Sequence, residues 1–162
     1  MILIALGSNQ SGPWGSPRET ITRALAQLDR DGLKLGAASR LLTSAPFGKT
    51  DQPPFVNAVA TVETHLPPKA LLHKLHAMER RAGRRRIRRW GPRTLDLDLI
   101  DYHGLVSAPN ERPVLPHPGI AERIFVLKPI AEIAPRWKHP RLRVPASLLL
   151  RRLGAMGEGA EI

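Results

Sequence analysis

The chain has 162 residues, of which 42% are hydrophobic and 24% are charged, an ordinary composition for a folded protein that excludes wholesale disorder. It contains no cysteine, which excludes disulfides and thiolate metal sites and fits a reducing compartment. The formal net charge of +11 predicts an anionic partner: a nucleic acid, a phospholipid surface or a phosphorylated small molecule.

The first half of the chain predicts a strand, a helix and two more strands. Residues 1–6, MILIAL, are a short apolar run before a turn, which predicts a buried strand. Residues 16–19, SPRE, combine a serine N-cap, a proline at the first helical position and a glutamate three residues after the cap, so a helix should begin here and end at Gly32. A weaker strand is predicted over 33–44. Alternating apolar and polar residues predict a half-buried strand over 55–65.

The second half begins with another helix. Residues 67–82 start with two prolines, carry apolar residues at helical spacing and stop before Gly83, which predicts a helix. The basic stretch 84–93 has no apolar period and predicts a mobile loop. Residues 94–100, TLDLDLI, alternate leucine with polar residues and predict a strand whose leucines share one face.

After this strand the sequence is first rich in turns and then helical. Residues 102–118 predict a turn-rich connection. Residues 122–135 look helical at both ends, with Pro129 interrupting the middle, and residues 145–154 predict a short amphipathic helix. We expect residues 155–162 to be a frayed tail.

This order of elements predicts a ferredoxin-like α+β fold, with a mainly antiparallel sheet and helices packed on its faces. Neither a repeat nor a linker divides the chain, so we expect a single domain over 1–162. No apolar run approaches the ~20 residues of a membrane span, and residues 1–7 lack the basic flank and the cleavage site of a secretory signal. We therefore expect a cytoplasmic protein without a membrane partner.

Two aspartates, Asp96 and Asp98, stand in the apolar run of the last predicted strand. Alternation along a strand places them on the same face with Cα atoms ~6.6 Å apart. Two bare carboxylates at that separation repel by about 2–3 kcal/mol at an effective dielectric constant of about 20. The alternative is an exposed strand face that carries aspartate by chance, but aspartate is a poor strand former and occurs here twice. A divalent cation or nearby arginines would turn the repulsion into attraction.

Eight arginines lie next to this aspartate pair in the sequence. A site with oxygen ligands favours Mg²⁺, which usually joins one or two carboxylates to substrate phosphates, and arginines grip phosphate oxygens. The combination predicts phosphoryl-type transfer. The chain carries no Walker A motif and no Gly-x-Gly-x-x-Gly motif, which excludes a P-loop enzyme and a standard protein kinase. The arginines are Arg80, Arg81, Arg84, Arg85, Arg86, Arg88, Arg89 and Arg93.

Several segments resemble, in order, the 6-hydroxymethyl-7,8-dihydropterin pyrophosphokinase family of folate biosynthesis. The stretch RWGPRTLDLDLI at 89–100 carries the resemblance most specifically, because the pattern W-G-P-R-x-L-D-L-D-L is typical of that family. The other segments are ALGSN at 5–9, FGKTDQPPFVNA at 47–58, ME and GR within 78–84, LPHP at 115–118 and RIFVLKPIAEIAP at 123–135.

The resemblance implies a reaction in which the β,γ-pyrophosphate of ATP passes as one unit to the exocyclic hydroxymethyl group of the pterin and AMP is released. Asp96 and Asp98 would bind two Mg²⁺ ions that span the ATP phosphates, and one aspartate could also help to remove the hydroxyl proton. Arg84 and Arg93 would stabilise charge on the phosphates. The arginine-rich loop would close as a lid that excludes water, sealed by Trp90.

The resemblance also implies the binding residues of a monomer whose partners are these two small molecules and no nucleic acid. For the pterin, two phenylalanines match stacking positions and an asparagine reads the ring edge, and Ser8 and Asn9 would support the pocket by hydrogen bonds. The pterin residues are Gly7, Ser44, Phe47, Phe55, Asn57, Trp90 and Phe125. The ATP residues are Glu79, Leu99, Arg112, His117 and Arg123.

Two other interpretations stay open. A small RNA-binding module also combines a ferredoxin-like sheet with arginine clusters, but its aromatic sheet motif is absent here and aromatic residues make up only 4% of the chain. The other is a catalytically silent homologue, which is disfavoured because the aspartate pair, the two matched arginines and the stacking positions are all present.

Overall fold

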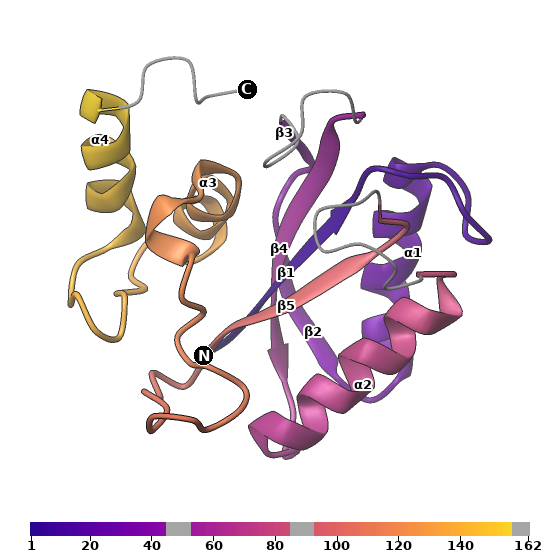
Figure 1. The fold of residues 1–162 in the computed structure, drawn as a ribbon, viewed down its shortest axis with the longest axis horizontal. Helices are drawn as coiled ribbons and strands as arrows, with labels where there is room; N and C mark the ends of the chain where they lie inside the picture. Colours follow the sequence, from indigo (N-terminus) through magenta and orange to yellow (C-terminus); the bar gives the residue numbers. More distant parts are fainter. Residues whose placement is uncertain (45–52, 85–92, 157–162) are drawn as a thin grey trace.

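An antiparallel sheet lies between two pairs of helices in this protein (Figure 1). The structure is a computed structural model, and it describes residues 1–44, 53–84 and 93–156. Its strands are β1 (Ile2–Ser8), β2 (Lys34–Ala38), β3 (Leu42–Ser44), β4 (Phe55–Glu63) and β5 (Asp96–Tyr102). Its helices are α1 (Pro17–Arg30), α2 (Pro68–Arg81), α3 (Ile124–Ile133) and α4 (Ala146–Met156), with a 3₁₀ turn, η1, at Ile120–Glu122. No helix in the described part is both long and apolar enough to cross a membrane.

The strand order β2-β4-β1-β5, with every pairing antiparallel, confirms the predicted ferredoxin-like α+β fold. β1 lies between β4 and β5, so the register brings distant residues together. Gly7 pairs with Asn57 on one side and with Asp96 on the other, and Ala5 pairs with Asp98. The pairing of β1 therefore places both aspartates beside the smallest residues of the central strand.

The predicted strand over 33–44 is wrong in one respect, because it forms two strands. Both β2 and β3 pair with β4, but the segment between them leaves the ladder. The Ser39 hydroxyl there accepts a hydrogen bond from the Val59 N–H at 2.9 Å, and Glu132 of α3 accepts one from the Arg40 N–H at 3.1 Å. These long-range bonds hold the connection between β2 and β3, and local sequence does not encode them.

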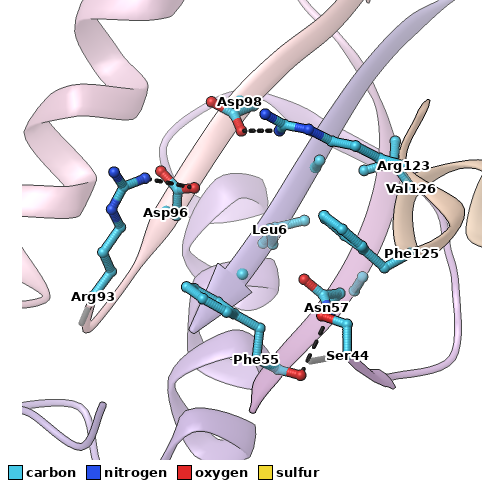
Figure 2. Close-up of a pocket in the computed structure, with 13 residues that line it drawn as sticks. Leu6, Ser44, Phe55, Asn57, Arg93, Asp96, Asp98, Arg123, Phe125 and Val126 are labelled. Atoms are coloured by element: carbon cyan, nitrogen blue, oxygen red, sulfur yellow. Dashed lines mark hydrogen bonds and ion pairs between the residues drawn. The ribbon is translucent and has the colours of Figure 1, made fainter. Parts of the chain in front are cut away.

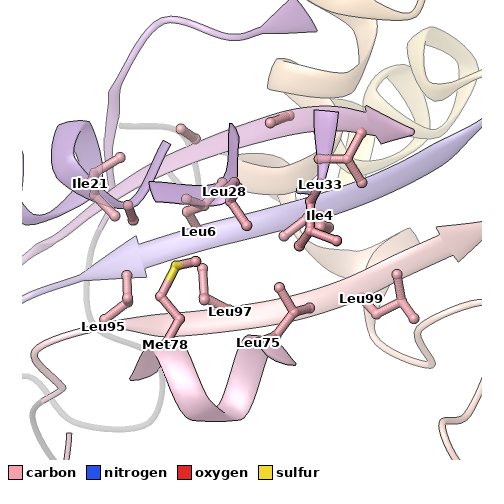
Figure 3. Packing of buried hydrophobic residues seen from close by; sticks show 14 of the residues in the cluster. Ile4, Leu6, Ile21, Leu28, Leu33, Leu75, Met78, Leu95, Leu97 and Leu99 are labelled. Atoms are coloured by element: carbon pink, nitrogen blue, oxygen red, sulfur yellow. The ribbon is translucent and has the colours of Figure 1, made fainter. Parts of the chain in front are cut away.

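One face of the sheet packs against α1 and α2. The even positions of β1 and β4 and the three leucines of the last strand region all point to this side, as the alternation predicts (Figure 3). Helix α1 begins with the predicted capping box, in which Ser16 Oγ accepts from the Glu19 N–H and Glu19 Oε1 accepts from the Ser16 N–H. The cluster includes Ile4, Leu6, Ile21, Leu28, Leu75, Met78, Leu95, Leu97 and Leu99.

The other face packs against α3 and α4 through a second, smaller cluster that includes Leu3, Val59 and Ile100. The expected interruption at Pro129 is wrong, since α3 runs without a break from Ile124 to Ile133. The proline removes a single helical hydrogen bond, and its buried ring contributes apolar surface that offsets this loss. Because α3 covers only part of this face, the rest of the sheet surface is left for a pocket.

Candidate active site

An open pocket of about 730 Å³, counting its mouth, lies on the second sheet face beside the first turn of α3 (Figure 2). Strands β1, β4 and β5 form its floor and α3 forms one wall. Its two ends differ in chemistry, because charged side chains gather at β5 and aromatic side chains at β4 and α3. The lining residues are Ala5, Leu6, Gly7, Ser44, Phe55, Asn57, Ala58, Arg93, Asp96, Asp98, Arg123, Phe125 and Val126.

Asp96 and Asp98 both line this pocket, which confirms that the two carboxylates share one face of a strand. They have room because their partners in β1 are Gly7 and Ala5. A Cβ atom at Gly7 would lie 3.4 Å from Asn57 Oδ1 and 3.6 Å from Phe55 Cδ1, so any side chain there would occupy the pocket floor. The glycine keeps the space between the two ends of the pocket open.

Asp96 is neutralised by two arginines. Arg84 Nη1 lies 2.7 Å from Asp96 Oδ1, and Arg93 Nη1 lies 3.2 Å from Asp96 Oδ2. Each guanidinium therefore contacts a different carboxylate oxygen. The repulsion predicted for the aspartate pair is thus offset at Asp96 by the arginines that the sequence places beside it.

Asp98 is much less well compensated. Its Oδ2 atom lies 3.9 Å from Arg123 Nη1 and 4.0 Å from His117 Nε2. Burial raises the pKa of Asp98 to about 7, and the charge of Asp96 acts in the same direction, while Arg123 opposes both. In the absence of a metal this carboxyl therefore takes up a proton near neutral pH.

His117 shifts the other way. Burial and the nearby charge of Arg123 lower the pKa of His117 to about 4, so the imidazole is neutral at pH 7. Its Nδ1 atom accepts a hydrogen bond from the Gly119 N–H at 3.2 Å, which places the ring proton on Nε2, the nitrogen nearest Asp98. The predicted ATP-contacting histidine therefore lies directly beside the candidate metal ligands.

The end of α2 fixes Arg84 in space. Gly83 adopts φ +88° after the helix, and the chain closes in a Schellman motif in which the Arg84 N–H donates to the Glu79 carbonyl at 3.0 Å. A side chain at Gly83 would also collide with Pro13, whose Cδ lies 2.6 Å from an ideal Cβ position. The helix stop predicted at Gly83 is confirmed, and it places Arg84 beside Asp96, which lines the pocket.

At the apolar end, Phe55 stands at the start of β4 and Phe125 in the first turn of α3, so their rings approach the pocket from two different elements. The amide nitrogen of Asn57 donates to Ser44 Oγ at 2.6 Å and to the Leu42 carbonyl at 3.3 Å. These bonds fix the amide orientation and turn its oxygen toward Gly7. The two phenylalanines predicted to stack on the pterin and the asparagine predicted to bind its edge therefore lie in the same pocket.

Asn9 makes hydrogen bonds to a pocket-lining residue, Arg93, in line with the support predicted for it. It is buried, and its Oδ1 atom accepts from the Arg93 N–H at 2.8 Å while its Nδ2 atom donates to the Pro53 carbonyl at 3.1 Å. Its own N–H donates to the Arg93 carbonyl at 3.0 Å. Asn9 therefore joins the backbone at Arg93 to the backbone at Pro53, and these particular partners are not evident from the sequence.

Four of the five predicted ATP residues do not line the pocket, and one of these, His117, lies beside Asp98 at its edge. The Leu99 side chain packs in the core on the opposite face of the sheet, so its predicted role in ATP binding stays a prediction that its side chain does not support. Arg112 is exposed and donates to the Glu111 carbonyl at 3.2 Å, and Glu79 is buried against Arg84. Phe47, Trp90 and the arginines of 85–92 lie outside the described residues.

The carboxylate pair fits a hard divalent cation. In the described ranges no group of three or more Asp, Glu, His or Cys side chains is arranged to hold a metal, so a cation here would have two protein carboxylates at most. Mg²⁺ is bound in this way, because it keeps several waters and takes further ligands from substrate phosphates. Asp96 and Asp98 are therefore suited to a metal that arrives with a phosphorylated substrate.

Comparisons with known proteins agree with this chemistry. The family model described as 7,8-dihydro-6-hydroxymethylpterin-pyrophosphokinase matches residues 3–135. The chain is 44% identical over 141 residues to a Pseudomonas aeruginosa protein and 41% identical over 146 residues to one from Haemophilus influenzae, both named 2-amino-4-hydroxy-6-hydroxymethyldihydropteridine pyrophosphokinase. These matches cover 86% and 90% of this chain and 83% and 89% of the two relatives.

A longer relative matches over a similar part of this chain. The mitochondrial folate synthesis bifunctional protein of Arabidopsis thaliana is 38% identical over 132 residues, which is 82% of this chain but only 23% of that protein. The family model spans both aspartates, Arg84, Arg93 and the aromatic wall of the pocket. The chain therefore belongs to the 7,8-dihydro-6-hydroxymethylpterin-pyrophosphokinase family and is a pyrophosphokinase of folate biosynthesis.

Proposed function

We propose that this protein transfers the terminal pyrophosphate of ATP to the hydroxymethyl oxygen of 6-hydroxymethyl-7,8-dihydropterin. The pterin oxygen bonds the β-phosphorus, the bond between the β-phosphorus and the oxygen that bridges it to the α-phosphorus breaks, and AMP leaves with that oxygen. The hydroxyl proton is lost in the same step. The observation that carries the proposal is the division of one pocket into an aromatic end and a carboxylate–arginine end.

The aromatic end suits a flat polar ring. Phe55 and Phe125 offer apolar faces, and the fixed Asn57 amide offers a hydrogen-bonding edge between them. A pterin held there would direct its hydroxymethyl group along the floor over Gly7 toward β5. Gly7 and Ser44 would contribute shape and hydrogen bonding at this end.

The charged end suits a polyphosphate. Asp96 and Asp98 would hold two Mg²⁺ ions, which when bound neutralise phosphate charge and polarise the phosphorus centres. Arg84, Arg93 and Arg123 would exchange their carboxylate partners for phosphate oxygens, which they can grip through paired N–H groups. The neutral His117 would offer its Nε2 proton to the nucleotide, and Arg112 would approach it from the turn-rich segment.

The alternative of an RNA-binding module is disfavoured by the second sheet face. Modules of that kind stack bases on aromatic residues of an open sheet. Here α3 and α4 cover much of the sheet face, and the two aromatic residues at the pocket come from β4 and from α3 itself. The pocket suits small molecules, and the proposal keeps the expectation of a monomeric single-domain enzyme of the cytoplasm without a nucleic-acid partner.

The experiment that tests this function is nucleotide analysis after incubation with ATP, Mg²⁺ and the hydroxymethyl pterin. We expect one AMP for each pterin diphosphate formed, and no AMP when the pterin is omitted. Formation of ADP with a pterin monophosphate, or release of AMP at the same rate without pterin, would contradict the proposal.

A further inference from the structure

Glu79 makes the most complete set of contacts around Arg84, although it does not line the pocket. Its Oε2 atom accepts from Arg84 Nη1 at 2.6 Å and from the Leu97 N–H at 2.8 Å. Glu79 is only 2% exposed and the Arg84 side chain 6%. A charged pair that is this deeply buried is held in one geometry, because neither partner can turn to water without leaving the other uncompensated.

Backbone and side chain act on Arg84 together. The Schellman motif binds the Arg84 N–H to the Glu79 carbonyl, and the side-chain pair binds its guanidinium to the Glu79 carboxylate. The same carboxylate binds β5 at Leu97, the residue between the two pocket aspartates. Glu79 therefore fixes the position of Arg84 relative to Asp96 and Asp98 from outside the pocket.

Acidic and basic side chains occur in equal number in this cluster among the described residues. Three carboxylates, Glu79, Asp96 and Asp98, face three guanidinium groups, Arg84, Arg93 and Arg123. In the reaction proposed above, a metal would take over Asp96, and Arg84 would lose that partner. Glu79 would then be the remaining anion among these contacts that holds the Arg84 guanidinium in place.

We propose that Glu79 is a positioning residue that holds the Arg84 guanidinium in place beside Asp96, whether Asp96 is paired with Arg84 or with a metal. The inference rests on the proposed function for its purpose, and it replaces the expected contact between Glu79 and ATP. Glu79 acts through Arg84, and Asp96 is the partner that Arg84 exchanges for phosphate. The geometry behind it is the shared Nη1 atom, which lies between the two carboxylates.

The direct test follows hydrogen exchange of the Arg84 guanidinium by NMR in the metal-free protein. Its N–H signals are assigned by their loss in Arg84→Lys. We expect exchange at least about tenfold slower than for an exposed arginine such as Arg112, unchanged in Asp96→Ala and accelerated to the exposed rate in Glu79→Gln. Protection that survives Glu79→Gln but is lost in Asp96→Ala would overturn the proposal. Glu63→Gln, at an exposed glutamate, is the matched control and should leave the signals unchanged.

A double-mutant cycle tests the consequence for catalysis. Glu79→Gln should lower kcat by about 10²-fold, the scale expected when a catalytic group is misplaced, but should cause no further loss in the Arg84→Ala background. Equal losses in both backgrounds would show that Glu79 acts independently of Arg84 and would overturn the proposal. Glutamine can still accept from the Leu97 N–H, so this variant should fold. If near-ultraviolet circular dichroism shows that Glu79→Gln is not folded, the test rests on hydrogen exchange in Asp96→Ala. Loss of Arg84 guanidinium protection in that variant contradicts the proposal.

The two proposals fail in different ways. If the wild-type protein forms no AMP, the proposed function is wrong, but the exchange measurement needs neither metal nor substrate and still decides the role of Glu79. If AMP forms and the exchange pattern is reversed, only the positioning role is wrong.

Discussion

The Oδ2 atom of Asp98 lies 4.0 Å from the Nε2 atom of His117, and the pKa values of the two side chains are shifted in opposite directions. Burial raises the pKa of the acid to about 7 and lowers the pKa of the base to about 4. Between these values the folded pair holds one proton on Asp98 and none on His117. This arrangement has consequences for stability that can be measured without any substrate.

Unfolding the metal-free protein should show two opposite pH dependences that cancel. Between pH 4 and pH 7 the folded Asp98 holds a proton that the unfolded chain releases, so its contribution to the free energy of unfolding falls as pH rises. Between pH 4 and pH 6.5 the folded His117 lacks a proton that the unfolded chain binds, so its contribution rises as pH rises. Each slope can reach about 1.4 kcal/mol per pH unit.

Urea unfolding at pH 4.5 to 6.5 separates the two contributions. Relative to wild type, Asp98→Asn should become more stable as pH rises and His117→Asn less stable, while the double variant should return to the wild-type slope. Single variants that change the slope in the same direction would show that the two pKa shifts are not opposite.

Loss of one pocket carboxylate should remove turnover but not the fold. Asp98→Ala takes away a candidate metal ligand whose charge is poorly compensated in the folded protein, so the variant should be at least as stable as wild type at pH 7. We expect kcat to fall by at least about 10³-fold, since metal stabilisation of transition-state charge is worth several kcal/mol. Steady-state assays combined with thermal melting check both parts, and full activity in a folded Asp98→Ala protein would rule out the metal role.

Asn9→Ala should misplace Arg93. The substitution removes the acceptor for the Arg93 N–H and the donor to the Pro53 carbonyl, and it leaves buried groups unpaired at a cost of about 1–3 kcal/mol in stability. We expect kcat to fall more than the affinity for the pterin, because Arg93 lies at the phosphate end of the pocket. Asn9→Asp keeps the acceptor and should retain more activity. The neighbouring exposed Gln10→Ala is the control, and equal losses in Asn9→Ala and Gln10→Ala would contradict the anchoring role.

Gly7→Ala should weaken pterin binding selectively. The added methyl group would lie 3.4 Å from Asn57 Oδ1 and 3.6 Å from Phe55 Cδ1, at the floor of the apolar end. These are ordinary van der Waals distances, so the protein accommodates the methyl group, but a ring bound over it would be crowded. Such crowding costs about 1–3 kcal/mol, so KM for the pterin should rise about ten- to hundredfold while KM for ATP changes little. Gly154→Ala, at an exposed helical position with open space around it, is the matched control. A larger effect on ATP than on pterin would place the ring elsewhere.

Local patterns predict much of this fold. Leucines at every second position of β5 point to the α1–α2 core, so the aspartates between them must face the other way. The capping box of α1 and the stop at Gly83 are likewise encoded within a few residues. In each case the physical cause, an alternation or a hydrogen bond to the next turn, acts over a short stretch of chain.

Features that depend on distant partners are not predictable in this way. The chain between β2 and β3 leaves the ladder because Ser39 binds β4 and Arg40 binds α3. Similarly, β5 gains an extra residue at Ile100, so that Asp101 pairs with Leu3 and remains on the face where Trp137 donates to its carboxylate. These contacts join residues far apart in the sequence, and no periodicity reports them.

The same distinction applies to the site. The aspartate pair and the stacking residues follow from motif and strand alternation, and the structure places them in one pocket. Glu79 and Leu99 match ATP-binding positions of the family pattern, but the packing of distant elements determines where their side chains lie. Glu79 is buried against Arg84, and the side chain of Leu99 belongs to the core behind the sheet.

The most direct measurement is a crystal structure of the protein with Mn²⁺ and a non-hydrolysable ATP analogue, with cations located by anomalous scattering. If the two carboxylates on β5 anchor the metals of the triphosphate, the Mn²⁺ ions should give anomalous peaks within bonding distance of both Asp96 and Asp98. Arg84 should then contact a phosphate oxygen. A bound nucleotide with no cation beside either aspartate would contradict this mechanism.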